Sequence, residues 1–130
     1  MRLGKQNGWA VAVAVIVALA ASSVALAAGG GVAGTYTTTI KRPAELKGTW
    51  VLTLAKNGGY KVALNGKTLA GGTYSATATT ITMREPTGCG GTGTYAWKRS
   101  GKTLRFVRKR EAPACHIRAT ILSHPFTKVR

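Results

Sequence analysis

The sequence predicts an all-β protein, a small antiparallel up-and-down β-barrel of about seven or eight strands with one short helix near the C-terminus. Apolar and polar residues alternate in short segments, which is typical of strands with one buried face. Turn residues separate these segments, and the 130 residues include 17 glycines and 4 prolines. Consecutive hairpins close readily into a barrel, and closure removes exposed sheet edges, so we favour a barrel over a small sandwich.

The first strand is predicted over residues 34–40, and the next two strands form a hairpin whose register follows from the sequence. Lys56-Asn57-Gly58 fits a three-residue loop with Gly58 in the left-handed conformation. This loop places the apolar side chains of both strands on one face. The predicted pairs are Trp50 with Leu64, Leu52 with Val62, and Leu54 with Tyr60.

The following hairpin turns at Asn65-Gly66, which places Leu69 opposite Val62. Counting by twos from Leu69 would put Tyr74 on the outer face of the sheet. We expect a bulge at Gly71-Gly72 to restore the phase, because glycine tolerates a bulge best.

Two more hairpins, a helix and a terminal strand complete the predicted barrel. The helix is expected within residues 112–123, where apolar residues recur at helical spacing, and the last strand over 126–129. The inner faces of the strands are apolar, and the outer faces carry Thr, Lys and Arg. The predicted pairs are Tyr74 with Ile81 and Ala76 with Thr79 around Thr77-Ala78, and Tyr95 with Phe106 and Trp97 with Leu104 around Ser100-Gly101.

The first 27 residues have the features of a cleavable signal peptide. Arg2 and Lys5 form a basic start, an apolar stretch covers residues 9–21, and Ala25-Leu26-Ala27 fits the small-x-small cleavage pattern. We therefore predict a secreted protein, with a flexible glycine-rich leader over 28–32 and a single barrel domain over 33–130. The alternative is an uncleaved N-terminal membrane anchor, because residues 9–28 are long enough to cross a bilayer.

The chain is strongly basic, with 19 Lys and Arg, 3 acidic residues and a formal net charge of +16. Removal of Arg2 and Lys5 with the signal peptide would leave +14. The acidic residues are Glu45, Glu85 and Glu111, too few for a paired-carboxylate hydrolase of ordinary design or a Ca²⁺ cage. We predict a protein that is not an enzyme and that holds no metal and no cofactor.

Cys89 and Cys115 are the only cysteines, and an even pair in an exported chain indicates a structural disulfide. Closing this loop would stabilise the domain by about 3 kcal/mol. The alternatives are a metal site that includes His116, or a redox couple. We favour the disulfide because Cys115-His116 matches no usual zinc spacing and the chain has no C-x-x-C motif.

Lys47-Gly48-Thr49-Trp50, near the start of the domain, is similar to the Gly-x-Trp motif of the lipocalins and their calycin relatives. The whole meander is similar in plan to the barrels of that superfamily. The resemblance implies a calycin-like barrel in which the tryptophan closes one end and an arginine late in the chain packs over it. Here Trp50 would be the tryptophan, and Arg118 or Arg108 the arginine.

Most aromatic residues are expected on the inner face, where they either fill the core or line a ligand cavity. Gly72 and Ala76 near Tyr74 are too small to fill the barrel from that side, which favours an unfilled interior. We predict a small apolar or amphipathic ligand inside the barrel, with Arg99 or Arg108 at the rim pairing with an acidic head group. The predicted ligand-binding residues are Trp50, Tyr60, Tyr74, Met83, Tyr95, Trp97, Phe106, Arg99 and Arg108.

The alternative function is an envelope-associated module that binds anionic cell-surface polymers or lipid head groups through its basic exterior, because so large a charge attracts polyanions. Nucleic acid is not favoured as the selected partner, because the rings that would stack on bases are expected to face inward. We expect a monomer. The predicted basic patch consists of Lys98, Lys102, Arg105, Lys109 and Arg110.

Overall fold

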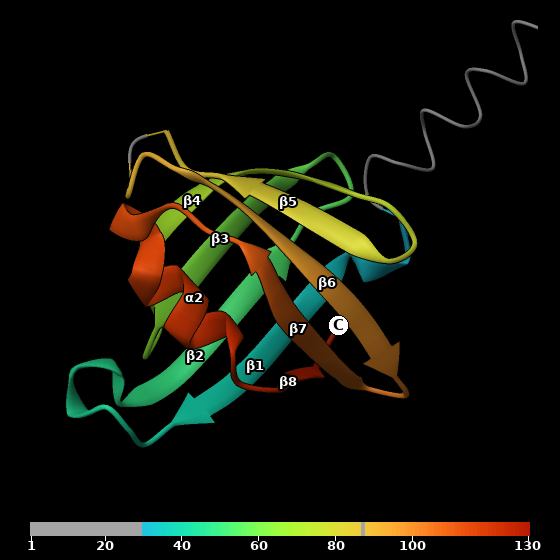
Figure 1. Cartoon of the computed structure of the whole chain (residues 1–130). Helices are drawn as coiled ribbons and strands as arrows, with labels where there is room; N and C mark the ends of the chain where they lie inside the picture. Colours follow the sequence, from blue (N-terminus) through green and yellow to red (C-terminus); the bar gives the residue numbers. More distant parts are fainter. Residues whose placement is uncertain (1–29, 87) are drawn as a thin grey trace, which may run out of the picture.

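The computed structural model describes residues 30–86 and 88–130, so the predicted signal peptide and the first two leader residues lie outside the described residues. The described chain forms a closed antiparallel barrel of eight strands in sequence order, with one short helix near the C-terminus, as predicted (Figure 1). The elements are η1 (Gly30–Val32), β1 (Gly34–Ile40), η2 (Ala44–Leu46), β2 (Gly48–Leu54), β3 (Gly59–Leu64), β4 (Lys67–Ala76), β5 (Thr80–Arg84), β6 (Thr92–Ser100), β7 (Thr103–Arg110), η3 (Pro113–Cys115), α2 (His116–Leu122) and β8 (Phe126–Lys128).

Strand β8 closes the barrel although it has only three residues. Phe126 pairs with Leu104 of β7 on one side, and Lys128 pairs with Tyr36 of β1 on the other. All eight strands therefore have two neighbours, which leaves no open sheet edge. In the part of the chain that the structure describes, no helix is long and apolar enough to cross a membrane.

The hairpin of β2 and β3 has the predicted register. Gly58 in its loop adopts a φ of +96°, and Asn65 and Gly66 in the next turn adopt +50° and +86°. These positive values are the ones that the predicted turns require. The observed pairs are Trp50 with Leu64, Leu52 with Val62, and Leu54 with Tyr60.

The bulge in β4 lies at Leu69, so the predicted bulge at Gly71-Gly72 is wrong. Val62 pairs with Ala70, and Leu69 is the extra residue, with 52% of its surface exposed. The alternation requires one phase change between Leu69 and Tyr74, but it does not indicate where the extra residue is inserted. The structure inserts it at the first position of that interval.

Gly72 has another role, because it lies where β4 and β5 approach each other closely. It pairs with Tyr60 of β3, and a Cβ atom at this position would overlap the carbonyl oxygen of Arg84. Backbone from the neighbouring strand therefore occupies the space that a side chain would take. Gly72 consequently does not create the void that its size predicts.

Two later hairpins turn one residue beyond the predicted positions. Thr77 N–H donates to the Thr80 carbonyl at 2.9 Å, and Thr77 Oγ1 accepts the N–H of Thr79 and Thr80, so this turn centres on Ala78-Thr79. Gly101 takes the first position of the other turn, with a φ of +61°. The register of each hairpin therefore differs from the predicted one by two residues. The predicted pairs are wrong, but the same residues lie on the inner face. The observed pairs are Tyr74 with Met83, Ala76 with Ile81, Trp97 with Phe106, and Arg99 with Leu104.

The core draws buried side chains from all eight strands, and an aromatic cluster lies on the side formed by β6, β7 and β8. Tyr95, Phe106 and Phe126 pack edge to face, with ring centroids 6.2 Å apart in each contact. Val32, which the sequence analysis placed in the leader, is fully buried, and its carbonyl accepts a hydrogen bond from the Tyr36 hydroxyl at 2.8 Å. The packed structure thus includes the end of that segment.

Candidate functional site

A cavity of about 220 Å³ lies between helix α2 and the inner faces of β2 to β5. Its wall is mostly apolar. Leu69 and Ile117 line it and are each about half exposed, so its mouth lies between β4 and α2. The lining residues are Trp50, Leu52, Tyr60, Val62, Leu69, Ala70, Met83, Glu85, Cys89, Ala114, Cys115, Ile117, Arg118, Ile121 and Leu122.

Three of the predicted ligand-binding residues line this cavity, namely Trp50, Tyr60 and Met83. They come from β2, β3 and β5, and each is buried. They line one cavity because the barrel curls these strands around a common interior (Figure 1).

The other six predicted residues lie away from the cavity. The Tyr74 hydroxyl donates to the Ala55 carbonyl at 2.7 Å, and Trp97 Nε1–H donates to the Thr77 carbonyl at 3.0 Å. Tyr95 and Phe106 belong to the aromatic cluster of the core. Arg99 and Arg108 are exposed and do not line the cavity.

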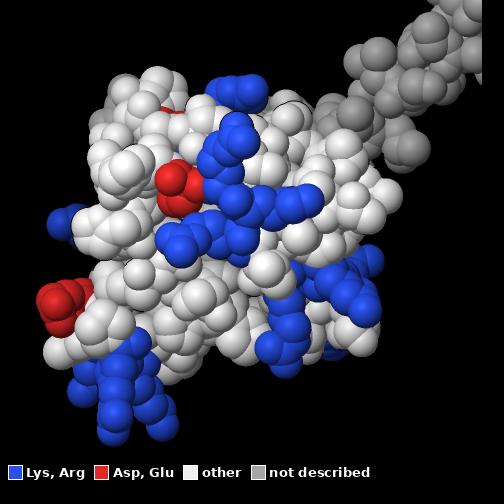
Figure 2. Space-filling model, in the orientation of Figure 1, with Lys and Arg blue, Asp and Glu red and all other residues white. Residues whose placement is uncertain are grey.

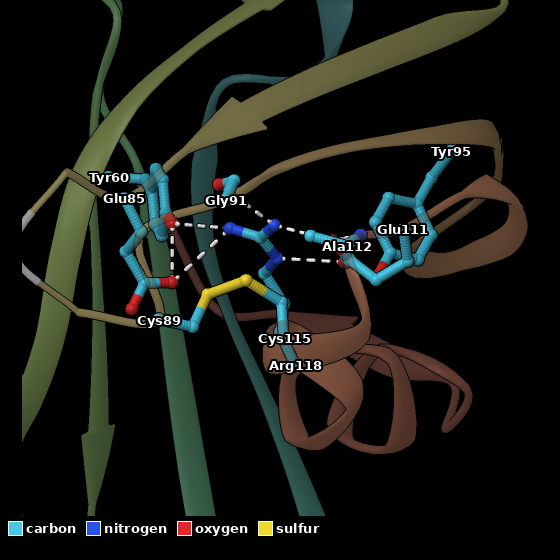
Figure 3. The surroundings of a disulfide bond; sticks show 9 residues. All are labelled: Tyr60, Glu85, Cys89, Gly91, Tyr95, Glu111, Ala112, Cys115 and Arg118. Atoms are coloured by element: carbon cyan, nitrogen blue, oxygen red, sulfur yellow. Dashed lines mark hydrogen bonds and ion pairs between the residues drawn. A yellow bond between two sulfur atoms is a disulfide. The ribbon is translucent and has the colours of Figure 1, made fainter.

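Arg118 of α2 forms the polar part of the cavity wall and is only 8% exposed. Its Nε and Nη2 donate to the two carboxylate oxygens of Glu111 at 2.9 and 2.6 Å. Nη1 donates to Glu85 Oε2 at 3.3 Å and to the Tyr60 hydroxyl at 3.4 Å, and Nη2 also donates to the Gly91 carbonyl at 3.2 Å. A guanidinium has five N–H groups, so these contacts engage all of its donors (Figure 3).

Two tyrosines complete this network. The Tyr60 hydroxyl donates to Glu85 Oε2 at 2.8 Å, and the Tyr95 hydroxyl donates to Glu111 Oε2. Burial raises the pKa of both phenols well above the usual value of 10, and the hydrogen bond that each donates to its carboxylate raises it further. Both hydroxyls therefore remain protonated donors throughout the neutral pH range.

The charges of the network stabilise one another. Burial alone would raise the pKa of Glu111, but hydrogen bonds from Arg118 and Tyr95 outweigh burial and lower it. Burial alone would lower the pKa of Arg118, but its hydrogen bonds with Glu111 and Tyr60 raise it instead. The guanidinium thus stays charged in an environment from which most water is excluded.

The predicted disulfide is confirmed. Cys89 and Cys115 are bonded, with their Cα atoms 5.2 Å apart, and both line the cavity. The bond links the loop between β5 and β6 to the residue immediately before α2 (Figure 3). Because α2 has only seven residues, it is too short to be stable by itself. The disulfide and Arg118 together hold it over the cavity.

The sequence analysis did not predict the Arg118 network, although the sequence carries one signal for it. Glu85 and Glu111 are two of only three acidic residues, and each precedes a cysteine of the disulfide by four positions, in EPTGC and EAPAC. A disulfide between two such segments brings the two carboxylates to the same end of the barrel. One buried cation near both of them is then required.

Of the two arginines that the lipocalin resemblance implies, Arg118 is buried and Arg108 is exposed. Arg118 lines the same cavity as Trp50. The indole Nε1–H of Trp50 donates to the Leu46 carbonyl at 2.7 Å, which fixes the ring at the start of β2.

All five residues of the predicted basic patch are exposed. Lys98 lies directly opposite Arg105 across β6 and β7, and Arg110 lies opposite Thr94. Within residues 30–86 and 88–130, no three His, Cys, Asp or Glu side chains are grouped so that they could hold a metal ion.

The cavity wall therefore combines apolar side chains with charged groups that are already paired with one another. Such a wall is suited to holding an apolar molecule away from water. Comparison of the chain with protein-family models, curated proteins and solved structures finds no match. What the structure shares with the calycins is its architecture, a closed antiparallel barrel of eight strands.

Proposed function

We propose that the protein is a secreted, non-catalytic binding protein of lipocalin-like plan that holds one small, neutral, apolar molecule beneath α2. The observation that carries this proposal is the apolar cavity of about 220 Å³, which opens between Leu69 and Ile117. Trp50 and Met83 provide large apolar surfaces inside it, and burial of a ligand against them removes apolar area from water.

The size of the cavity limits the ligand. An apolar cavity of roughly 150 Å³ holds a benzene molecule. A cavity of about 220 Å³ therefore suits a single ring with a short substituent, or a chain of about six carbons. A long fatty acid would extend through the mouth into water.

The charges of the wall favour a neutral ligand over an acid. Every N–H group of Arg118 is already donated, and Arg118 is the only Lys or Arg in the lining formed by the described residues. A ligand carboxylate would therefore meet Glu85 without a free cation to pair with it. Arg99 and Arg108 lie outside the lining, so the proposed ligand has no acidic head group held by them.

The proposal is tested by NMR titration of the folded, isotope-labelled protein with 1-hexanol and with hexanoate. Burial of six carbons at about 0.8 kcal/mol each gives about 5 kcal/mol, or a dissociation constant on the order of 0.2 mM for hexanol. We expect saturable shifts of the cavity-lining amides with hexanol and at least tenfold weaker binding of hexanoate. Absence of saturable binding, or tighter binding of hexanoate, would overturn the proposal.

A matched pair of variants identifies the site. Val62→Phe fills the cavity from β3, whereas Val107→Phe makes the same change on the outer face of β7, where Val107 is 65% exposed. We expect V62F to lose hexanol binding and V107F to keep it. Equal binding by both variants would place the ligand elsewhere.

A further inference from the structure

The hairpin of β6 and β7 presents a concentration of positive charge on the outside of the barrel. We define the hairpin basic face as Lys98, Lys102, Arg105, Lys109 and Arg110, all of which are exposed. Lys and Arg side chains gather on the front of the molecule, where β6 and β7 lie (Figures 1 and 2). This face is separate from the cavity, because none of these five residues lines it.

These cations have no carboxylate partners in the part of the chain that the structure describes. Both ion pairs found there belong to Arg118, which engages Glu85 and Glu111. The third acidic residue, Glu45, lies in η2, between β1 and β2. The charge of the hairpin basic face is therefore left for a partner outside the chain.

The placement of Lys98 beside Arg105 is unfavourable for folding. They lie directly opposite each other on neighbouring strands, and like charges at such positions destabilise a sheet. A shallow groove runs over these two residues and over Ser100 and Thr103, which form the next pair on the same face. Two cationic groups and two hydroxyls therefore surround one groove, and all four can donate hydrogen bonds to the oxygens of a phosphate-type oxyanion.

The cations are spread along the hairpin rather than gathered in a round cluster. Arg105 and Arg110 lie opposite Lys98 and Thr94 on the outer side of the sheet, and at about 3.4 Å per residue they are roughly 17 Å apart along β7. Lys109 is the extra residue at the bulge next to Arg110. Lys98 and Lys102 continue the charge to the end of the hairpin. Cations spread along the outer side of a hairpin match a linear chain of anions, because separate groups of the same chain can meet separate side chains.

Other features of the face distinguish between classes of anionic partner. A single-stranded nucleic acid needs exposed rings for its bases, but Tyr95 and Phe106 of this hairpin are buried, and Trp97 is half buried with its N–H donated to Thr77. A membrane surface favours several apolar side chains among the cations, but Val107 is the only large exposed one among the described residues of the hairpin.

We propose that the hairpin basic face binds a linear polymer that carries repeated phosphate-type oxyanions. Arg105 and Lys98 provide the central contacts, with Ser100 and Thr103 donating hydrogen bonds in the groove. The remaining cations of β7 hold the next groups of the same chain. Binding neutralises the repulsion between Lys98 and Arg105, so the polymer also stabilises the fold.

The test uses sodium polyphosphate of about 20 phosphate groups as the probe, with calorimetric titration of the full chain. The variant is K98Q/R105Q, and the matched control is K56Q/K61Q, which removes the same charge from exposed residues of β3 and its preceding loop. We expect K98Q/R105Q to bind at least tenfold more weakly, and K56Q/K61Q to change affinity less than threefold. A plot of the logarithm of the association constant against the logarithm of the salt concentration has a negative slope. This slope should become less steep by about 2 in K98Q/R105Q, because two phosphate contacts are lost.

Three results would overturn the proposal. Equal loss of affinity in both double variants would show that only the total charge matters. Tighter binding of phosphatidylglycerol vesicles than of polyphosphate, lost in K98Q/R105Q, would assign the face to a membrane. Tighter binding of an oligothymidylate of 20 nucleotides would assign it to nucleic acid. Thermal unfolding of each variant checks that it is folded, and hexanol binding, which involves none of these residues, is expected to be unchanged.

Discussion

Arg118 connects more of the molecule than any other side chain of the ion-pair network. It reaches from α2 to groups beside β3, β5, β6 and β7, and it is the cation that faces Glu85 and Glu111. The carboxylate side chains are 9% and 2% exposed, so water provides little alternative solvation for them. Removal of Arg118 would therefore leave the charges of both carboxylates buried and unpaired, which is strongly destabilising.

Replacement of Arg118 by Met is expected to lower the free energy of unfolding by about 3–5 kcal/mol, because two buried carboxylates lose their cation. Urea unfolding at pH 7 measures this change. The control is R99M, which alters an exposed arginine and is expected to change stability by less than about 0.5 kcal/mol. A loss below about 1 kcal/mol in R118M would contradict the role assigned to the network.

Glu111 makes the stability depend on pH in the acidic range. Its pKa is lowered by folding, so its contribution is fully present above the ordinary value of 4.5 and is lost as the pH falls through the lower folded value. We expect the free energy of unfolding to decrease from pH 5 to pH 3, and E111Q to show a smaller decrease. E45Q, which removes an exposed carboxylate outside the network, is the matched control. An unchanged slope in E111Q would exclude this assignment.

Strand β4 and its turns show how backbone geometry sets the pairing of elements. The bulge at Leu69 changes the phase of the strand, so that Tyr74 faces the core. The turn at Ala78-Thr79 then pairs Tyr74 with Met83. The bulge is therefore needed to bring Tyr74 inward, whereas the position of the turn changes only which residues pair and leaves the inward residues the same.

Gly72→Ala is expected to weaken the contact between β4 and β5. The added methyl group would overlap the Arg84 carbonyl oxygen, which is backbone and cannot rotate away. We expect a loss of about 1–3 kcal/mol in the free energy of unfolding, as for other overpacked sites. Chemical denaturation measures it, and S75A, an exposed change on the same strand, is the control. Equal stability of G72A and S75A would show that the strands can separate without cost.

The whole molecule carries a formal net charge of +16, and its two internal ion pairs in the described chain share a single arginine. Most Lys and Arg side chains therefore repel one another across the barrel surface. The closed sheet and the disulfide hold these charges close together in the folded state, whereas the unfolded chain can separate them.

Added salt is therefore expected to stabilise the protein. Raising NaCl from 10 to 300 mM shortens the Debye length from about 30 Å to less than about 10 Å, which screens the repulsion. Each 1 kcal/mol gained would raise the Tm by about 4–8 °C for a domain of this size. Calorimetry at both salt concentrations measures the shift, and K98Q/R105Q should show a smaller one. A Tm that falls with added salt would mean that attractive pairs dominate the surface.

The sequence by itself determined the barrel, its inward and outward faces, the disulfide and the position of the helix. Alternation and turn residues report on each strand locally, so Trp50, Tyr60 and Met83 could be assigned to the interior. The register of two hairpins could not be fixed, because moving a turn by one residue shifts the pairs by two and leaves the faces unchanged. Export, the ligand and the exterior partner stay predictions.

Only the tertiary structure decided where the cavity lies and how the few acidic residues are used. Arg118 meets Tyr60, which is 58 positions away, and Glu85, which is 33 positions away. No local pattern specifies such contacts, because they exist only after the sheet has closed and α2 has been fixed over it. The cavity lies beneath the helix rather than beside Tyr74. Its position depends on how the strands curve and how closely their backbones approach, and the sizes of the side chains do not reveal either.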